Sequence, residues 1–186
     1  MRTLLVSCSL LVSCALLTAC IERPFDAPAA APSRATVDRA ALQGVLIAAP
    51  PADAIAVGAL FGNAAELVGY KLEPPALLPN QKARLTFYWR CRAPLEAWHI
   101  FVHLDEAEGG RIHAEHDPAG GRFPTDAWKP GDLIADTITF ESHANPLLLY
   151  VGLFSQGETR LTLTSPGRGR DDANNRLFVG ALPIAR

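Results

Sequence analysis

Cysteine is scarce in this sequence of 186 residues, and three of its four cysteines lie within the first twenty residues. We expect Cys8 and Cys14 to leave with a cleaved leader and Cys20 to become the first residue of the mature chain. Cys91 would then be the only thiol left in the folded part, which excludes an intramolecular disulfide. A domain of roughly 130 residues can still bury a substantial core without cross-links.

An excess of charge of either sign is also missing. The 17 Lys and Arg residues nearly balance the 19 Asp and Glu residues, for a formal net charge of −2. Proteins that bind nucleic acids or anionic surfaces through their overall field usually carry a clear basic excess. We therefore expect no nucleic-acid partner.

Several motifs of catalytic chemistry are absent from the sequence. It contains no Gly-x-Ser-x-Gly elbow, no His-Glu-x-x-His pair, no phosphate-binding glycine loop and no Cys-His nucleophile signature. A carboxylate pair such as Asp126 and Asp132 could in principle perform acid–base hydrolysis, but its separation is not set by the sequence. The sequence thus favours a protein without catalytic activity or cofactor, and does not decide the matter.

No hydrophobic run is long enough for a membrane span. Residues 4–17 are apolar and follow Arg2, but they fall short of the ~20 residues that a spanning helix needs. Residues 1–19 therefore read as a signal peptide. Its end, Leu17-Thr18-Ala19-Cys20, resembles the lipobox of bacterial lipoproteins, which implies a diacylglycerol on the thiol of Cys20. The alternative is a plain signal peptide with an incidental cysteine.

This resemblance also implies a cellular location. Ile21 follows the cysteine, and in such lipoproteins it is mainly Asp at that place that retains the protein at the inner membrane. We expect a lipid-anchored protein of the bacterial cell envelope, with the outer membrane favoured.

Residues 20–55 are rich in Ala and Pro and show no sustained alternation, so we expect the lipidated cysteine to be followed by a tether. Within it, residues 36–48 could form a short helix with Thr36 as the cap and Asp38 in the first turn. The folded domain is expected over residues 56–186.

That domain reads as all-β. Residues 82–92 alternate strictly, with Ala83, Leu85, Phe87, Trp89 and Cys91 on one face and polar residues or Tyr on the other. This pattern makes Cys91 a buried small residue rather than a nucleophile. Together with the turn signals between them, about eight such runs predict a single antiparallel β-sandwich, immunoglobulin-like or jelly-roll-like. We expect strands over residues 65–72, 82–92, 98–105, 111–117, 133–140, 147–154, 159–164 and 177–184.

Residues spread over about 57–184 also carry a resemblance to a known family. They are Gly69-Tyr70, Leu85, Tyr88-Trp89, Phe101-Val102-His103-Leu104, Asp117, Gly120-Gly121, Pro124-Thr125, Trp128, Pro130-Gly131-Asp132 and Asp136. On these residues the chain resembles a β-sandwich domain found at the C-terminal ends of some bacterial multi-pass glycosyltransferase-like membrane proteins, and also as free-standing envelope proteins. The resemblance implies the fold and the location but supplies no catalytic residues. The chain departs from that pattern because it has no glycosyltransferase portion.

The stretch FVHLDEAEGGRIHAEHD, residues 101–117, is the first candidate site. Strands 98–105 and 111–117 would form a hairpin around residues 106–110. If Asp105 lies opposite Arg111, then His103 lies opposite His113, and both share a face with Asp105 and Glu115. Two imidazoles and nearby carboxylates could hold zinc, which takes three or four ligands.

An ordinary solvated outer face explains the same residues. A slip of one residue in the register would also send the two histidines to opposite faces. His116 falls on the other parity and is expected to point inward or toward the hairpin edge.

The second candidate is the long connection over residues 117–131. Arg122, Phe123, Asp126 and Trp128 combine aromatic rings with charged hydrogen-bonding groups, as sugar-binding sites do. The alternative is that Trp128 is a plug in the core at the edge of the sandwich.

The leading functional hypothesis is a lipid-anchored, extracytoplasmic and non-catalytic module that binds a glycan or a protein partner in the envelope. The alternative is a metal-dependent envelope enzyme that uses His103, His113 and the neighbouring carboxylates. A purely structural lipoprotein within a larger complex is a third possibility.

Overall fold

The computed structural model describes residues 35–155 and 159–185. The expected signal peptide, Cys20 and the first part of the expected tether lie outside these residues. Within the described part of the chain, no helix has the length and apolar character that a membrane span requires.

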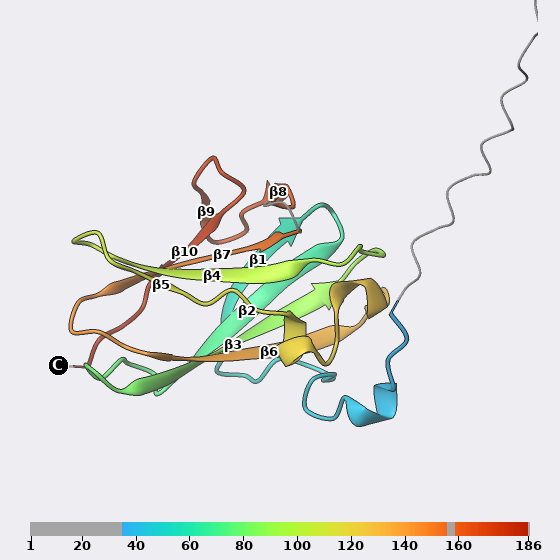
Figure 1. Ribbon diagram of the computed structural model, residues 1–186, viewed down its shortest axis with the longest axis horizontal. Coiled ribbons are helices and arrows are strands. Elements are labelled where there is room, and N and C mark those ends of the chain that lie inside the picture. Colours follow the sequence, from blue (N-terminus) through green and yellow to red (C-terminus); the bar gives the residue numbers. More distant parts are fainter. Residues whose placement is uncertain (1–34, 156–158, 186) are drawn as a thin grey trace, which may run out of the picture. The chain divides into compact units, whose positions relative to one another are not determined.

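Two antiparallel sheets of five strands each face one another (Figure 1). The first has the order β6-β3-β2-β1-β8 and the second the order β5-β4-β7-β10-β9. The strands are β1 (Ile55–Phe61), β2 (Ala65–Glu73), β3 (Lys82–Cys91), β4 (His99–Glu106), β5 (Arg111–His113), β6 (Leu133–Glu141), β7 (Leu147–Phe154), β8 (Leu163–Ser165), β9 (Arg170–Asp171) and β10 (Leu177–Ala181). The prediction of an all-β sandwich is therefore confirmed.

Each of the eight expected strands has a counterpart, and β1 and β9 were not predicted. β1 carries a register irregularity between Ala56 and Ala59, and Gly58 lies there with a φ of 71°. This break interrupts the alternation that marks a strand in sequence. β9 has only two residues, both polar and exposed, and offers no hydrophobic signal.

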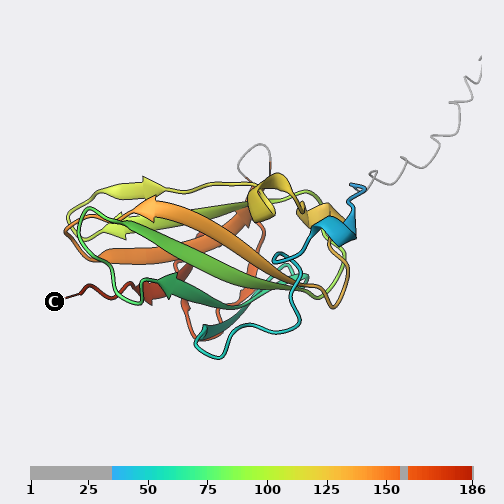
Figure 2. The same cartoon turned by 90° about the horizontal axis from the view of Figure 1, so that it is seen from below.

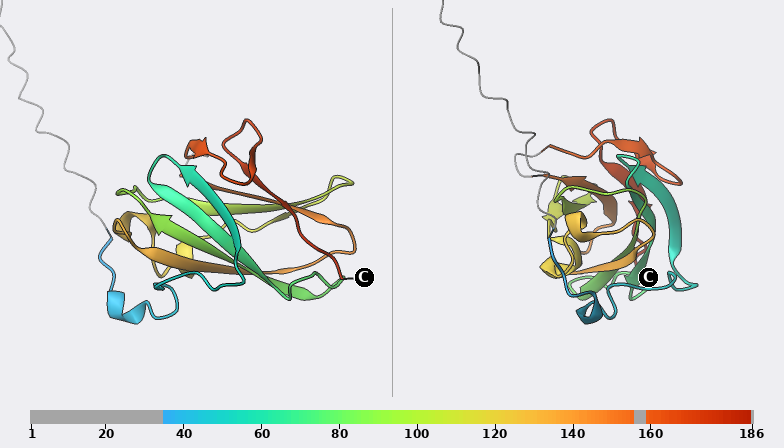
Figure 3. Two further views of the ribbon diagram at one scale, coloured as in Figure 1. Left: turned by 180° about the vertical axis from the view of Figure 1, so that it is seen from behind. Right: turned by 90° about the vertical axis from the view of Figure 1, so that its right-hand side faces the viewer.

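The core lies between the two sheets, which face one another in the end-on view of Figure 3. The five residues predicted to face inward from β3, from Ala83 to Cys91, are all buried. Trp89 of β3 and Phe61 of β1, the strands on either side of β2, pack with their ring centroids 5.8 Å apart. The predicted burial of Cys91 is confirmed.

Part of the segment expected to be tether packs on the sandwich. Leu42 and Val45 are buried, and the Ile47 amide donates a hydrogen bond to the carbonyl of Leu133. A short 3₁₀ helix, η1 (Arg39–Ala41), precedes them, and its cap is Asp38 rather than Thr36. The Asp38 carboxylate accepts a hydrogen bond from the Ala40 amide. Apolar side chains at 42 and 45 explain why this piece joins the edge of β6.

A bidentate ion pair fastens the same segment to the long connection before β6. The Arg39 guanidinium donates to both carboxylate oxygens of Asp132, at 2.6 Å and 3.1 Å, and lies 5.6 Å from the centre of the Phe123 ring. Residues 35–41 lie at the opposite end of the sandwich from residues 182–185 (Figures 1 and 2). The described chain thus enters the domain at one end and leaves it at the other.

The predicted β4–β5 register is also confirmed. His103 pairs with His113 and Asp105 with Arg111. The same register continues past β5, because Ile100 pairs with His116 in an isolated bridge. His116 consequently has the opposite parity to His113, as predicted.

His116 joins the two sheets at their open edge. Its Nε2–H donates to the Asp136 carboxylate at 2.7 Å, and its Nδ1–H donates to the Ala114 carbonyl at 2.9 Å. The Ala114 carbonyl can only accept, so Nδ1 carries a proton, and the raised pKa of His116 beside Asp136 favours a second proton on Nε2 and a cationic ring. Asp136, in the middle of β6, is fully buried.

Asp136 also supports the turn that follows β5. Its second oxygen accepts a hydrogen bond of 2.7 Å from the amide of Ala119, in the 3₁₀ segment η2 (Pro118–Gly121). Ala119 adopts a φ of 55°, in the left-handed region that is costly for a residue with a side chain. The buried carboxylate therefore holds both a cation and a strained turn in place.

The ion pair makes stability depend on pH. Burial alone would lower the pKa of His116, but the hydrogen bond and charge of Asp136, with a contribution from Asp117, raise it above its ordinary value. Its stabilisation is therefore complete below about pH 6.5 and is lost as the pH rises through the raised folded-state pKa. We expect His116→Gln to lower the free energy of unfolding by about 3 kcal/mol at pH 6, and by less as the pH approaches 9.

Urea denaturation of the wild type and the variant across this range measures the difference, in which contributions from other groups cancel. His113→Gln, on the exposed face, is the matched control and should change the free energy of unfolding by less than about 0.5 kcal/mol. A difference between wild type and His116→Gln that does not vary with pH would contradict the ion pair.

Candidate functional site

The outer face of β4 is not the ordinary solvated surface that the sequence offered as an alternative to a metal site. Phe101 and His103 point away from the core of the sandwich, yet they are only 3% and 6% exposed. Arg160 covers Phe101, with its guanidinium carbon 5.0 Å from the ring centre. Arg176 lies beside His103, 3.5 Å from Nδ1, and also donates to Asp105 at 3.1 Å. Side chains from the C-terminal part of the chain thus enclose this face.

Gly152 lets Phe101 lie flat on the sheet. It faces Phe101 across the β4–β7 pair. A Cβ atom at position 152 would come within 2.3 Å of the Phe101 ring, closer than any real contact. The glycine therefore provides the space in which the ring packs against its neighbours.

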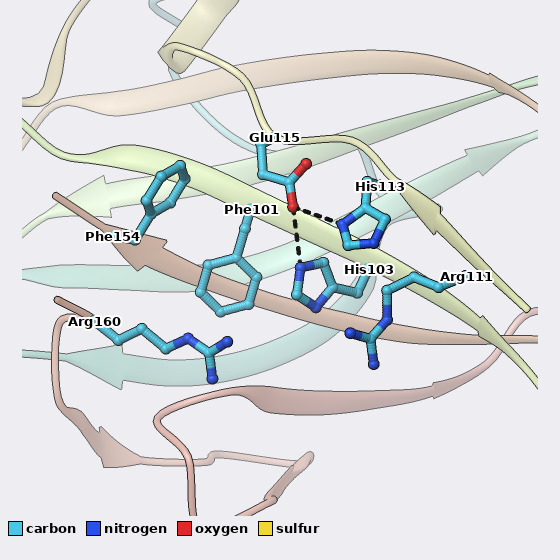
Figure 4. Close-up of a pocket in the computed structure, with 7 residues that line it drawn as sticks. All are labelled: Phe101, His103, Arg111, His113, Glu115, Phe154 and Arg160. Atoms are coloured by element: carbon cyan, nitrogen blue, oxygen red, sulfur yellow. Dashed lines mark hydrogen bonds and ion pairs between the residues drawn. The ribbon is translucent and has the colours of Figure 1, made fainter. Parts of the chain in front are cut away.

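A pocket of about 350 Å³ opens on this face. It is lined by Phe101, His103, Arg111, His113, Glu115, Phe154 and Arg160. Figure 4 shows the two phenylalanines and Arg160 on one side and Arg111 on the other, with Glu115 and the two histidines between them. The pocket therefore combines an apolar wall with groups that can bind a charged or hydroxylated ligand.

At the centre of the pocket, two imidazoles share one carboxylate oxygen. Nε2–H of His103 donates to Oε1 of Glu115 at 3.1 Å, and Nδ1–H of His113 donates to the same atom at 3.0 Å (Figure 4). The rings of the two histidines meet edge to face, with centroids 5.1 Å apart. The predicted cross-strand histidine pair is thus formed, and Glu115 completes it.

The environment sets the protonation of these groups. Burial lowers the pKa of His103, the charge of Arg111 lowers it further, and Glu115 only partly offsets the two. Burial would raise the pKa of Glu115, but the hydrogen bonds from His113 and His103 outweigh it and lower that pKa. At neutral pH the pocket therefore holds a neutral His103 and an ionised Glu115.

Asp105, the fourth residue of the candidate metal set, pairs with two arginines and does not join the two histidines. Its carboxylate accepts hydrogen bonds of 2.5 Å and 2.8 Å from Arg111 and one of 3.1 Å from Arg176. These arginines hold the pKa of Asp105 low despite its burial. The close set is therefore His103, His113 and Glu115, whose ligand atoms all lie within 4.8 Å of one another.

The second candidate set is not assembled as a binding surface. Phe123 and Trp128 are 0% and 1% exposed, and the Trp128 indole N–H donates to the Phe123 carbonyl at 2.9 Å. Asp126 accepts a hydrogen bond from the Ala35 amide, and the Arg122 side chain bonds to the carbonyl of Ala119. Because neither ring offers a face to a sugar, the burial supports the alternative in which Trp128 is a plug in the core.

Sequence reasoning assigned no site role to the core carboxylate of Asp136 or to four lining residues, Phe101, Arg111, Phe154 and Arg160. Phe154 and Arg160 flank a turn and carry no motif of their own. Arg111 was used only to set the hairpin register. Asp136 was named only among the residues of the resemblance, and its role could have been predicted because it alternates with Ile134 and Ile138 on the inward face of β6, where a carboxylate needs a buried partner.

Comparisons with known proteins do not assign the chain to a family. No family model and no curated protein matches the chain. The chain is similar to a solved structure described as the crystal structure of the C-terminal domain of Wzt, at 14% sequence identity and a TM-score of 0.45. That match covers 70% of this chain and 86% of the other. The association with glycosyltransferase-like membrane proteins stays a prediction.

The arrangement predicts the titration of His103. Its pKa should lie below the ordinary value of about 6.5, fall further in Glu115→Gln, and rise in Arg111→Gln because a repelling cation is removed. NMR titration of the imidazole resonances measures each value. His116, which faces Asp136 on the other side of the sheet, is the internal control and should not change. Equal shifts of both histidines in the two variants would contradict the proposed local coupling.

Proposed function

We propose that this protein is a lipid-anchored, extracytoplasmic binding module of the bacterial envelope, without catalytic activity, and that the pocket on the outer face of β4, β5 and β7 is its binding site. The observation that carries the proposal is the pocket itself, which brings aromatic, cationic and imidazole side chains together on one sheet. The lipobox and the Ala- and Pro-rich segment support the location.

We propose an acidic glycan as the ligand of this pocket. The half-buried ring of Phe154 supplies an apolar wall against which a pyranose ring can pack. Arg111 and Arg160 line the same pocket, and guanidinium groups form charge-assisted hydrogen bonds with carboxylates. An acidic sugar presents both features, an apolar ring face and an anionic group. A protein partner remains the other outcome of a binding test.

Binding of an acidic oligosaccharide should depend on Arg160. We expect the full-length protein to bind a hexuronate oligosaccharide and to bind a neutral oligosaccharide of equal length at least about tenfold more weakly, because one charge-assisted hydrogen bond contributes roughly 1.5 kcal/mol or more. Arg160→Gln should remove this preference, as measured by titration calorimetry.

Arg168→Gln is the matched control, since it removes the same charge from an exposed residue that does not line the pocket. Equal binding of both sugars by the wild type, or equal loss in the two variants, would argue against a glycan site here. Recovery of one envelope protein by the wild type but not by Arg160→Gln would point to the protein partner.

The lipid anchor has its own test. We expect the mature wild-type protein to carry the added mass of acyl chains and to fractionate with membranes, because acylation supplies about 0.8 kcal/mol of membrane binding per buried methylene. Cys20→Ser should abolish both properties without changing the thermal stability of the folded domain. Intact mass measurement and membrane fractionation check this. An unacylated wild-type protein would refute the anchor.

A further inference from the structure

The triad of His103, His113 and Glu115 has a composition that suits a transition metal. Two imidazole nitrogens and a carboxylate are common zinc ligands, whereas Mg²⁺ and Ca²⁺ prefer oxygen ligands alone. We propose that these three residues bind one zinc ion and leave a fourth coordination position open to the pocket. This goes beyond the proposed glycan binding and does not depend on it.

The present distances are close to those of a tetrahedral site. Zinc lies about 2.0–2.2 Å from nitrogen and oxygen ligands, which places neighbouring ligand atoms about 3.3 Å apart. Oε1 of Glu115 is 3.1 Å from the nitrogen of His103 and 3.0 Å from that of His113. The ligand atoms of the three residues all lie within 4.8 Å of one another, so side-chain movements of the exposed His113 and Glu115 can close the site around an ion.

No other histidine in residues 35–155 and 159–185 shares a carboxylate in this way. His99, His116 and His143 each pair with a single carboxylate, of Asp117, Asp136 and Glu106 respectively. Those are ordinary ion pairs or hydrogen bonds. Only the pair on β4 and β5 converges on one oxygen, which is the arrangement that a metal ion between three ligands would replace.

Zinc binds imidazole through an unprotonated nitrogen and carboxylate in its ionised form. An ion at this point would therefore take the place of the two N–H protons that His103 and His113 now direct at Oε1 of Glu115. The bidentate pair with Asp105 partly offsets the repulsion between Arg111 and a bound metal ion.

Arg176 opposes metal binding weakly. Its guanidinium lies 3.5 Å from Nδ1 of His103, which must gain the proton when Nε2 binds zinc. This is the longest hydrogen bond of Arg176, and its hydrogen bonds to Asp105 and Asp172 do not depend on it. Zinc binding should therefore move the His103 proton from Nε2 to Nδ1 at the loss of one long hydrogen bond.

The open fourth position would preferentially bind an anionic oxygen ligand. Zn²⁺ with one carboxylate keeps a charge of +1, and Arg160 on the pocket wall adds another cation. A carboxylate or phosphate oxygen fits this field better than a neutral donor.

Equilibrium dialysis of the full-length protein against Zn²⁺, in an excess of Mg²⁺, tests the proposal. We expect one zinc ion per chain and an affinity at least tenfold weaker in both His113→Ala and Glu115→Gln. His143→Ala, which removes an exposed histidine from another carboxylate, is the matched control and should bind as the wild type does. All variants keep every cysteine, so a loss reports the histidine site.

A second measurement does not rely on the folding of a variant. Nitrogen chemical shifts of His103 in the wild type should show the proton on Nε2 without zinc and on Nδ1 with it. Absence of stoichiometric zinc, zinc retained by either triad variant, or an unchanged His103 tautomer would overturn the proposal. Because no sugar is present, these outcomes are independent of the glycan experiment.

Discussion

The two sheets meet at the edge formed by β5 and β6 through the ion pair between His116 and Asp136. A carboxylate in the middle of an inward-facing strand is costly unless a charged partner and hydrogen bonds satisfy it. One oxygen of Asp136 accepts a hydrogen bond from the His116 imidazolium, and the other accepts a hydrogen bond from the Ala119 amide. The direction of the chain after β5, and with it the placement of the hairpin that carries the pocket, depends on this one buried group.

The pocket lies on the opposite side of the same hairpin. His113 and Glu115 face outward while His116, one residue further, faces inward, because side chains of an extended chain alternate. The histidines on the two faces therefore differ in charge. Burial with an anion makes the inner histidine a cation, whereas burial near Arg111 keeps the outer His103 neutral.

Local patterns were sufficient to predict much of this arrangement. Strict alternation in β3 identified its buried face, and the short loop between residues 105 and 111 set the register that pairs His103 with His113. Alternation also assigned His116 to the other face. These predictions succeeded because they involve residues within one strand or one hairpin, where geometry follows from the period of two.

The burial of the outer face could not be predicted in the same way. His103 is enclosed by Arg176, which is 73 residues further along the chain, and Phe101 is covered by Arg160. Nothing in the composition of residues 98–117 signals these long-range contacts. The same limit applies to Trp128, for which the sequence left both a sugar platform and a core plug open, and only tertiary packing distinguishes them.

The attachment of the N-terminal segment has a mechanical consequence. Pulling on residue 35 would load the hydrogen bond between the Ala35 amide and Asp126 first, then the Arg39–Asp132 ion pair, and then the hydrogen bonds that join residues 45–47 to β6. Leu42 and Val45 would have to leave the core before β6 itself could detach. Tension from the N-terminal side is therefore borne at the edge of the first sheet, and the β4–β5 hairpin with its pocket, which belongs to the other sheet, lies outside that load path.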